Sequence, residues 1–243
     1  MKILYFTATG NCLDISRKLA ANCGGAELLS IPQLIKNGVG SIEDDVIGVV
    51  FPVFACNLPA IVTRYLRSAK LSASYKVAVV AHGGGPGGIA NLLAATDFGF
   101  DNIFLVSTWS NYLPFNPDRK PVATDVTAAC QAISADVRAR KTRQFTPDSS
   151  MAPFDPAPWA ESSLTYQRRP DCINCGLCAD ICPVGNCQLT DGEYKFDNRC
   201  EACMACLQNC PTVALHMPNE PTRFRYRNPN ITVEDIVAAN TQK

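Results

Sequence analysis

The chain has 243 residues, of which 47% are hydrophobic and 18% charged, as in an ordinary globular protein of one or two domains. The net charge is zero, no basic tract suggests nucleic acid, and no apolar run reaches the roughly 18 residues that a membrane span needs. The amino-terminal apolar stretch is too short for an export signal. We therefore expect a cytoplasmic protein with no membrane span and no nucleic-acid partner.

The first 142 residues alternate between short apolar strands and amphipathic helices. The expected strands are Lys2–Phe6, Ala26–Ser30, Val46–Val53, Lys76–Ala81 and Asn102–Ser107. The expected helices are Leu13–Ala21, Pro59–Ala69, Gly88–Thr96 and Ala123–Lys141. This alternation predicts an α/β fold with a doubly wound parallel sheet of five strands and right-handed crossovers.

Ligands bind such a sheet beyond the carboxyl ends of its strands, and the first loop there is Thr7-Ala8-Thr9-Gly10-Asn11-Cys12. It opens a helix, whose amino-terminal N–H groups and dipole favour an anion. The loop contains no lysine, and no G-x-x-x-x-G-K-[ST] motif occurs in the chain. We therefore expect a phosphate monoester rather than a triphosphate.

Three further loops leave the same edge of the sheet. Residues 51–59 carry two aromatic side chains and two prolines and suggest a rigid apolar wall for a planar ring. Residues 83–88 contain five glycines, which allow close approach of backbone to a ligand, and residues 109–114 form the last candidate.

The glycine-rich loop also matches G-x-G-x-x-G between a strand and a helix, the pattern of a dinucleotide site. However, no acidic residue stands about 20 positions further on, where Thr108 and Trp109 lie, so a ribose partner is missing. A loop that contacts a bound ligand is the favoured interpretation, and a plain tight turn is the alternative. His82, just before the loop, is either a polar residue at a strand end or a contact to the ligand.

Residues 143–170 are rich in Pro, Ser and Asp and indicate a linker. Two cysteine runs follow, Cys172-x2-Cys175-x2-Cys178-x3-Cys182-Pro and Cys200-x2-Cys203-x2-Cys206-x3-Cys210-Pro. This spacing is that of bacterial iron–sulfur proteins, in which the fourth cysteine binds the other cluster. We expect two [4Fe-4S] clusters, the first held by Cys172, Cys175, Cys178 and Cys210 and the second by Cys200, Cys203, Cys206 and Cys182. Zinc sites fit the spacing poorly, and disulfides would need an oxidising compartment and a sign of export.

Four cysteines outside the runs (Cys12, Cys23, Cys56 and Cys130) are scattered, which fits reduced thiols, and we expect Cys187 to pack against a cluster. The tail after residue 217 begins with an irregular basic stretch and ends in a short helix, Thr232–Ala239, capped by Thr232. The basic stretch either packs back on the first half or meets a partner.

These features together resemble a known family. Residues 171–217 resemble dicluster ferredoxins, and the T-x-T-G-N loop resembles the phosphate loop of flavodoxins, which bind FMN. The whole chain is similar to the flavodoxin–ferredoxin fusion proteins of anaerobes, often labelled EFR-type ferredoxins. The resemblance implies a flavodoxin-like sheet in the order 2-1-3-4-5 over residues 1–142 and a linker over 143–170. It further implies a small α+β ferredoxin domain over 171–217 and a carboxy-terminal extension over 218–243.

The resemblance also implies an FMN site. Its residues would be Thr7, Thr9, Gly10, Asn11, Cys12, Pro52, Phe54, Ala55, Asn57, Gly83, Gly84, Gly85, Gly87, Gly88, Asn111 and Tyr112. Two departures stand out. Cys12 replaces a usual threonine, and a thiol is a weaker donor than a hydroxyl. The loop between Pro52 and Pro59 has no glycine, so Asn57 is the residue expected to take left-handed geometry there.

The implied function is electron transfer. The chain would shuttle low-potential electrons between FMN, the two clusters and external donor and acceptor proteins. The alternative is an FMN-dependent reductase of a small organic substrate, fed through the clusters and using His82 or Tyr112 as a proton donor. A redox sensor is a third class, and the sequence leaves direction, partners and oligomeric state open.

Overall fold

The computed structural model describes residues 1–54, 56–84, 88–113, 125–146, 162–190, 193–218 and 220–243. The amino-terminal half holds strands β1 (Lys2–Tyr5), β2 (Glu27–Ser30), β3 (Ser41–Glu43), β4 (Val46–Pro52), β5 (Lys70–Ser72), β6 (Tyr75–His82) and β7 (Asn102–Ser107). Its helices are α1 (Asn11–Asn22), α2 (Ile31–Lys36), α3 (Ala60–Ser68), α4 (Ile89–Ala94) and α5 (Thr127–Arg138).

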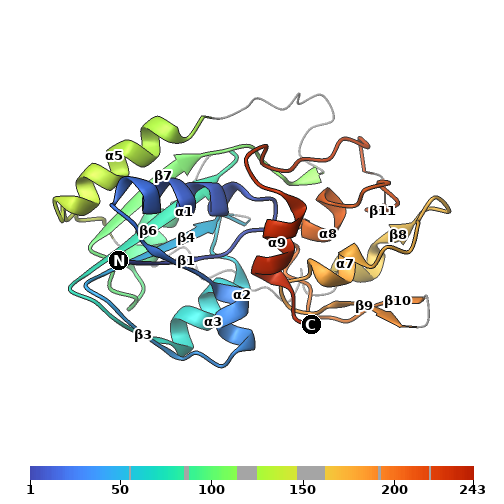
Figure 1. Ribbon diagram of the computed structural model, residues 1–243, viewed down its shortest axis with the longest axis horizontal. Helices are drawn as coiled ribbons and strands as arrows, with labels where there is room; N and C mark the ends of the chain where they lie inside the picture. The colour runs from blue at the N-terminus through green and yellow to red at the C-terminus, as the bar shows by residue number, and fades with distance from the viewer. Residues whose placement is uncertain (55, 85–87, 114–124, 147–161, 191–192, 219) are drawn as a thin grey trace.

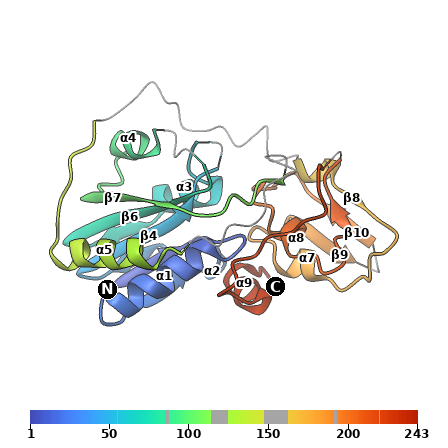
Figure 2. The ribbon, with the colours of Figure 1, turned by 90° about the horizontal axis from the view of Figure 1, so that it is seen from above.

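The main sheet has the order β2-β1-β4-β6-β7, and all its neighbours pair in parallel. Numbered within this sheet, the order is 2-1-3-4-5, so the flavodoxin-like doubly wound fold is confirmed. Helices α1 and α5 pack together on one face, while α3 and α4 lie on the other (Figure 2). Because helices cover both faces, the central strands are almost wholly apolar, and Ile47, Val49, Val50 and Phe51 are fully buried.

Two features of the amino-terminal half were not expected from the sequence. Helix α2 follows β2 directly, with Pro32 in its first turn, where the missing N–H costs no hydrogen bond. Strands β3 and β5 form a separate parallel pair of three residues each, too short for a periodicity to register. The other elements begin and end within a few residues of expectation, and the start of the expected helix Ala123–Lys141 includes residues outside the described part.

The carboxy-terminal half is a small α+β unit at one end of the sheet (Figure 1). It contains a 3₁₀ turn, η2 (Ser162–Thr165), and two antiparallel pairs, β8 (Gln167–Arg168) with β11 (Leu215–His216), and β9 (Cys187–Thr190) with β10 (Glu193–Phe196). Each cysteine run leads into a one-turn helix, α7 (Leu177–Asp180) or α8 (Ala205–Gln208). Among the described helices, none is both long and apolar enough to cross a membrane.

The tail ends in helix α9 (Val233–Asn240), which lies against α2 of the first half (Figure 1). Thr232 caps it as expected: its hydroxyl accepts from Asp235 N, and the Asp235 side chain accepts from Thr232 N. Arg17 on α1 pairs with Asp235 at 2.6 Å and, as a hydrogen-bond donor, lowers the pKa of that carboxyl to about 2. The basic stretch before this helix contacts both parts of the molecule: Tyr226 and Asn228 bond to the first half, whereas Arg223 pairs with Asp171 of the cysteine-rich part.

Candidate functional site

A cleft of about 440 Å³ opens at the carboxyl ends of β1, β4, β6 and β7. This volume lies within the range of small-molecule and cofactor sites. Its walls on the amino-terminal half come from all four of the loops singled out above: Thr7, Ala8, Thr9, Asn11, Cys12, Pro52, Val53, Phe54, Cys56, His82, Gly83, Gly84, Trp109, Ser110, Asn111 and Tyr112. The fold therefore brings the four sequence-distant loops together around one space.

The first loop is held in shape from within and from behind. Thr7 Oγ1 accepts from Gly10 N at 3.1 Å, and Gly10 itself has a φ of 97°. The Asn11 amide donates to Trp109 O at 3.2 Å, while Asn11 Oδ1 accepts from Tyr226 Oη at 2.7 Å. The side chain of Asn11 is thus engaged in fixing the loop. Burial raises the pKa of the Cys12 thiol well above its usual range, so Cys12 faces the cleft as a neutral group.

The second loop differs from expectation at one position. Cys56, with a φ of 64°, takes the left-handed conformation that was expected of Asn57. Asn57 instead pairs with Phe54 through the backbone, and its side chain accepts from Leu58 N at 2.7 Å. Asn57 is buried and is not among the residues that line the cleft. Ala55 lies outside the described residues.

The glycine-rich loop and the loop after β7 touch each other. A Cβ added at Gly83 would overlap with Ser110, so Gly83 is required by this contact whatever the ligand. Gly84 lines the cleft, and its carbonyl contacts the His82 ring. Gly88 precedes α4 and is not on the cleft wall, while Gly85 and Gly87 lie outside the described residues.

The last wall of the cleft comes from the second cysteine run and was not expected. Cys200, Glu201, Ala202 and Met204 line the same space as the loop of residues 7–12. Asn111 links the two halves here, because its amide donates to Cys203 O at 3.4 Å. Nothing in the local sequence signals this wall, since it depends on how the two halves dock.

The two cysteine runs repeat their backbone conformation as well as their spacing. Left-handed residues occur at three matching places: Asn174, Gly176 and Gly185 in the first run and Ala202, Met204 and Val213 in the second. For residues other than glycine this conformation costs about 1–2 kcal/mol each. Such strain persists only where the surroundings fix it, which is typical of functional loops.

The first expected set of four cysteines converges. Cys172, Cys175, Cys178 and Cys210 all line one cavity of about 50 Å³. A hydrogen bond from the Cys187 thiol lowers the pKa of Cys178 to about 7, and the same contact raises that of Cys187. Cys187 is 4% exposed and packs against a member of the set. A thiolate at Cys178 is the form that binds iron.

In the second set, the charge of Cys182 acts on two cysteines of the other run, Cys203 and Cys206. Burial raises the pKa values of the Cys203 and Cys206 thiols, and the charges of Cys182 and Cys200 raise both further. Backbone N–H groups point at two of the sulfurs, from Asn186 to Cys182 at 3.2 Å and from Ala202 to Cys200 at 3.3 Å. Within the part of the chain described, no three His, Cys, Asp or Glu side chains converge on a single-ion site. A cubane is different, since each thiolate there binds its own iron.

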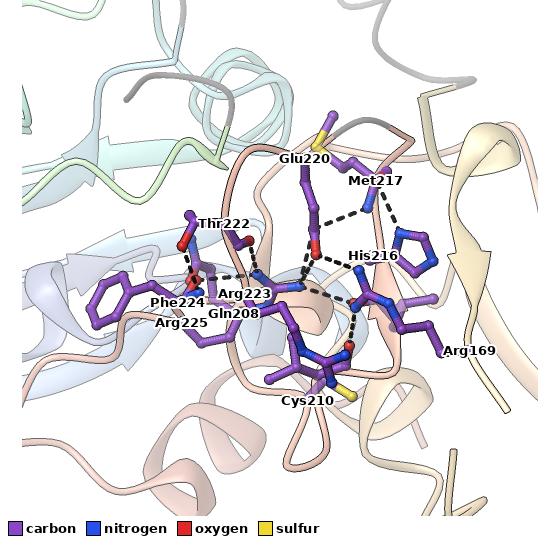
Figure 3. A network of polar contacts seen from close by, with 12 residues as sticks. Arg169, Gln208, Cys210, His216, Met217, Glu220, Thr222, Arg223, Phe224 and Arg225 are labelled. Carbon is purple, nitrogen blue, oxygen red and sulfur yellow. Dashed lines mark hydrogen bonds and ion pairs between the residues drawn. The ribbon is translucent and has the colours of Figure 1, made fainter. Parts of the chain in front are cut away.

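A buried ionic network ties the tail to the cysteine-rich half (Figure 3). Glu220 accepts from Arg225 at 2.8 and 3.0 Å and from Arg169 at 3.2 Å. The Glu220 and Arg225 side chains are only 3% and 8% exposed. Removing Glu220 would leave the buried Arg225 guanidinium without its carboxylate, which is strongly destabilising. The basic stretch of the tail therefore has a structural role.

Comparisons with known proteins each match only a part of the chain. No family model matches the chain. A protein of Methanocaldococcus jannaschii described as an uncharacterised ferredoxin is 40% identical over 52 residues, covering 19% of this chain and 68% of that protein. The fold and site define a protein with a flavodoxin-like sheet and a cysteine-rich α+β unit. Through the matched segment, the chain belongs to the ferredoxin family.

Solved structures resemble the chain over a little more than half its length. A flavodoxin from the domain Archaea covers 57% of this chain and 97% of its own, with 14% identity and a TM-score of 0.36. An FMN-dependent NADH-azoreductase from Bacillus anthracis, in complex with FMN, covers 58% and 99%, with 11% identity and a TM-score of 0.36. The fold assignment rests on the strand order and not on these distant likenesses.

Proposed function

We propose that this protein is a flavo-iron–sulfur electron carrier. FMN would occupy the cleft at the end of the sheet, and the two cysteine sets would each hold a [4Fe-4S] cluster. The domain boundaries proposed from the sequence, at residues 142, 170 and 217, would separate flavodoxin-like, linker, ferredoxin and tail segments. FMN takes up two electrons and releases them singly, whereas each cluster moves one electron at a time.

The residues of the cleft fit FMN. Thr7 and Thr9 supply hydroxyls beside the amino-terminus of α1, a twelve-residue helix whose dipole favours a phosphate. Phe54, Trp109 and Tyr112 supply apolar and aromatic surface for a planar ring. The remaining proposed contacts are Gly10, Cys12, Pro52, Gly83, Gly84, Asn111 and, outside the described residues, Ala55, Gly85 and Gly87. Asn57 and Gly88 support the loops from behind.

The cysteine sets fit four-iron clusters. In the first set, four sulfurs from both runs share one small cavity. In the second, Cys182 acts electrostatically on Cys203 and Cys206. This crossing of the fourth cysteine is the pattern of two-cluster ferredoxins.

The observation that carries the proposal is the shared wall. The cleft is lined both by the loop of residues 7–12 and by Cys200, Glu201, Ala202 and Met204 of the second cysteine run. A group bound there would touch the loop that holds a cluster, so electrons could pass between them without leaving the protein. External donor and acceptor proteins would exchange electrons with this pair.

A second candidate is an FMN-dependent reductase of a small organic substrate. His82 and Tyr112 both line the cleft, and either could supply a proton to a substrate above the flavin. The cleft would then need room for both molecules. Turnover of small quinones or azo compounds by the anaerobic protein, with reduced ferredoxin as donor, would favour this candidate.

The decisive experiment is anaerobic purification followed by measurement of iron, sulfide and flavin. The proposal expects about eight irons per chain, on two four-iron clusters, and one FMN after reconstitution. Riboflavin, which lacks the phosphate, serves as the matched control and should bind more weakly. A colourless preparation, or an iron-loaded chain that does not bind FMN, would contradict the proposal.

A further inference from the structure

Glu201 is a buried carboxylate in the second cysteine run that reaches into the other half of the molecule. Its side chain is 2% exposed. Oε2 accepts from Ile61 N at 2.9 Å, and Oε1 pairs with Arg64 at 2.7 Å. Both partners belong to α3, whose amino-terminus follows the Phe54–Pro59 loop of the cleft. The loop between Cys200 and Cys203 thus caps a helix of the flavodoxin-like half.

This capping contact is what a nine-residue helix without a local cap needs. Pro59, at the capping position of α3, makes no side-chain cap hydrogen bond, and the first N–H groups of a helix have no partner within it. Glu201 satisfies one of them and places negative charge where the helix dipole favours it. The contact also fixes the neighbouring Cys200, Ala202 and Met204 at the cleft wall.

The four cysteines of the first set do not line the cleft, although Gln208 and Asn209, which precede Cys210, donate to the cleft residues Asn111 and Ala8. These four cysteines line their own cavity, which shares no residue with the cleft. Cys175 is exposed, and the neighbouring Ile173 is 63% exposed. The two sets therefore differ in what they face, one the cleft and the other the outside.

We propose that Glu201 is a positioning residue that clamps the second cysteine run onto α3. The cluster of Cys182, Cys200, Cys203 and Cys206 is thereby the one that exchanges electrons with the cleft, while the first cluster serves external proteins. The electron-transfer part of this inference rests on the proposed function. With both groups bound, the second cluster would supply the flavin with one electron at a time. Two such electrons and two protons from solvent would complete one flavin reduction, and an external reduced protein would restore the cluster.

The clamp itself is tested without any cofactor. Amide hydrogen exchange at Ile61 and Val62 is compared in the wild type, Glu201→Ala, Glu201→Gln and the exposed control Glu193→Gln. Loss of the cap in Glu201→Ala should speed exchange about fivefold, the factor equivalent to about 1 kcal/mol. Glu201→Gln keeps an acceptor for Ile61 N and should remain close to the wild type and to Glu193→Gln. Unchanged exchange in Glu201→Ala would overturn the clamp.

The electron-transfer part is tested on the loaded protein by flash photolysis, which follows internal electron transfer between flavin and clusters. Glu201→Ala should lose the fast phase, and Glu201→Gln should restore it. A Cys182→Ala/Cys200→Ala double variant should also lose it. A fast phase that survives in either Glu201→Ala or the double variant would overturn the role of the second cluster. If the wild type binds no flavin, both the proposed function and the electron-transfer role of the second cluster are overturned. The hydrogen-exchange test of the Glu201 contact is unaffected by that outcome.

Discussion

Gly10 is a single residue that allows the tail to pack against the first cleft loop. It has a φ of 97°, and a Cβ placed on it would lie 2.9 Å from Ile231 Cβ and 3.0 Å from Asn228 Cβ. Asn228 N donates to Thr9 O at 2.8 Å, so the tail lies directly on the back of the first cleft loop. Only a residue without a side chain allows both the turn and this contact.

Replacing Gly10 by alanine should therefore cost more than a left-handed glycine usually does. Gly24 provides a matched control, because its φ is 80° and nothing lies within 4 Å of an added Cβ. Gly24→Ala should cost about 1 kcal/mol for backbone strain. Gly10→Ala should cost about 1–3 kcal/mol more through overpacking against the tail. Urea unfolding of both variants measures the difference, and equal midpoints would contradict the close packing.

At the scale of elements, the two cysteine runs act as one interlocked unit. The crossing of Cys182 and Cys210 can be tested by pairs of alanine substitutions and iron analysis. If the fourth cysteines cross, Cys182→Ala/Cys200→Ala removes one cluster and leaves about four irons, whereas Cys182→Ala/Cys175→Ala damages both. If each run holds its own cluster, the two results are exchanged. The two patterns cannot be confused, because each double variant is the control for the other.

The tail is the other element with a role beyond its own stability. Tyr226 donates to Asn11 and lies beside Trp109, with ring centroids 5.9 Å apart. Burial raises the pKa of Tyr226 to about 12, from a usual 10.0. Since the folded pKa is the higher one, its stabilising effect is complete below pH 10 and is lost as the pH rises towards 12.

Tyr226→Phe should accordingly be less stable than the wild type by about 1 kcal/mol at neutral pH. The difference should shrink above pH 10, because the phenylalanine variant has nothing to ionise there. Urea midpoints across this range measure it, and ultraviolet titration of the wild type against Tyr226→Phe gives the phenol pKa directly. A phenol that ionises near its usual pKa of 10.0 would contradict the burial of the Tyr226 side chain.

The elements that could be predicted from the sequence are those with local signals. Apolar runs such as Val46–Pro52, the cysteine spacing and the Thr232 cap each depend on neighbouring residues, and all appear in the structure. Helix α2 carries Pro32 in its first turn, and β3 and β5 are three residues each, so neither shows a clear period.

The cleft was predictable only in part for the same reason. Its four amino-terminal loops follow apolar strands, and the fold places them together. The wall formed by the second cysteine run, including Glu201, depends on docking between distant segments. A glutamate between two cysteines carries no sign of the helix that it caps, and the tail behind Gly10 is more than 200 residues away in the chain.

At the scale of the whole molecule, three segments meet at the cleft. The sheet supplies the cleft, the second cysteine run supplies its outer wall, and the tail supports the first loop from behind. Further bonds hold the tail, from Asn240 to Thr7 O at 3.0 Å and from Gln33 to Thr241 O at 2.8 Å. A ligand in the cleft should therefore affect the stability of the cysteine-rich half as well as of the sheet.

This linkage gives a last prediction. A ligand that binds only the folded state stabilises it by about 2.7 kcal/mol at a hundredfold excess over Kd. Because Cys200, Ala202 and Met204 belong to the cleft wall, bound FMN should slow the loss of iron to a chelator, followed as bleaching of cluster absorbance. Protection should be weaker with riboflavin, which lacks the phosphate, and should largely vanish in Glu201→Ala, where the wall is released from α3. Identical bleaching rates with and without FMN, in a protein that demonstrably binds it, would mean that the two halves unfold independently.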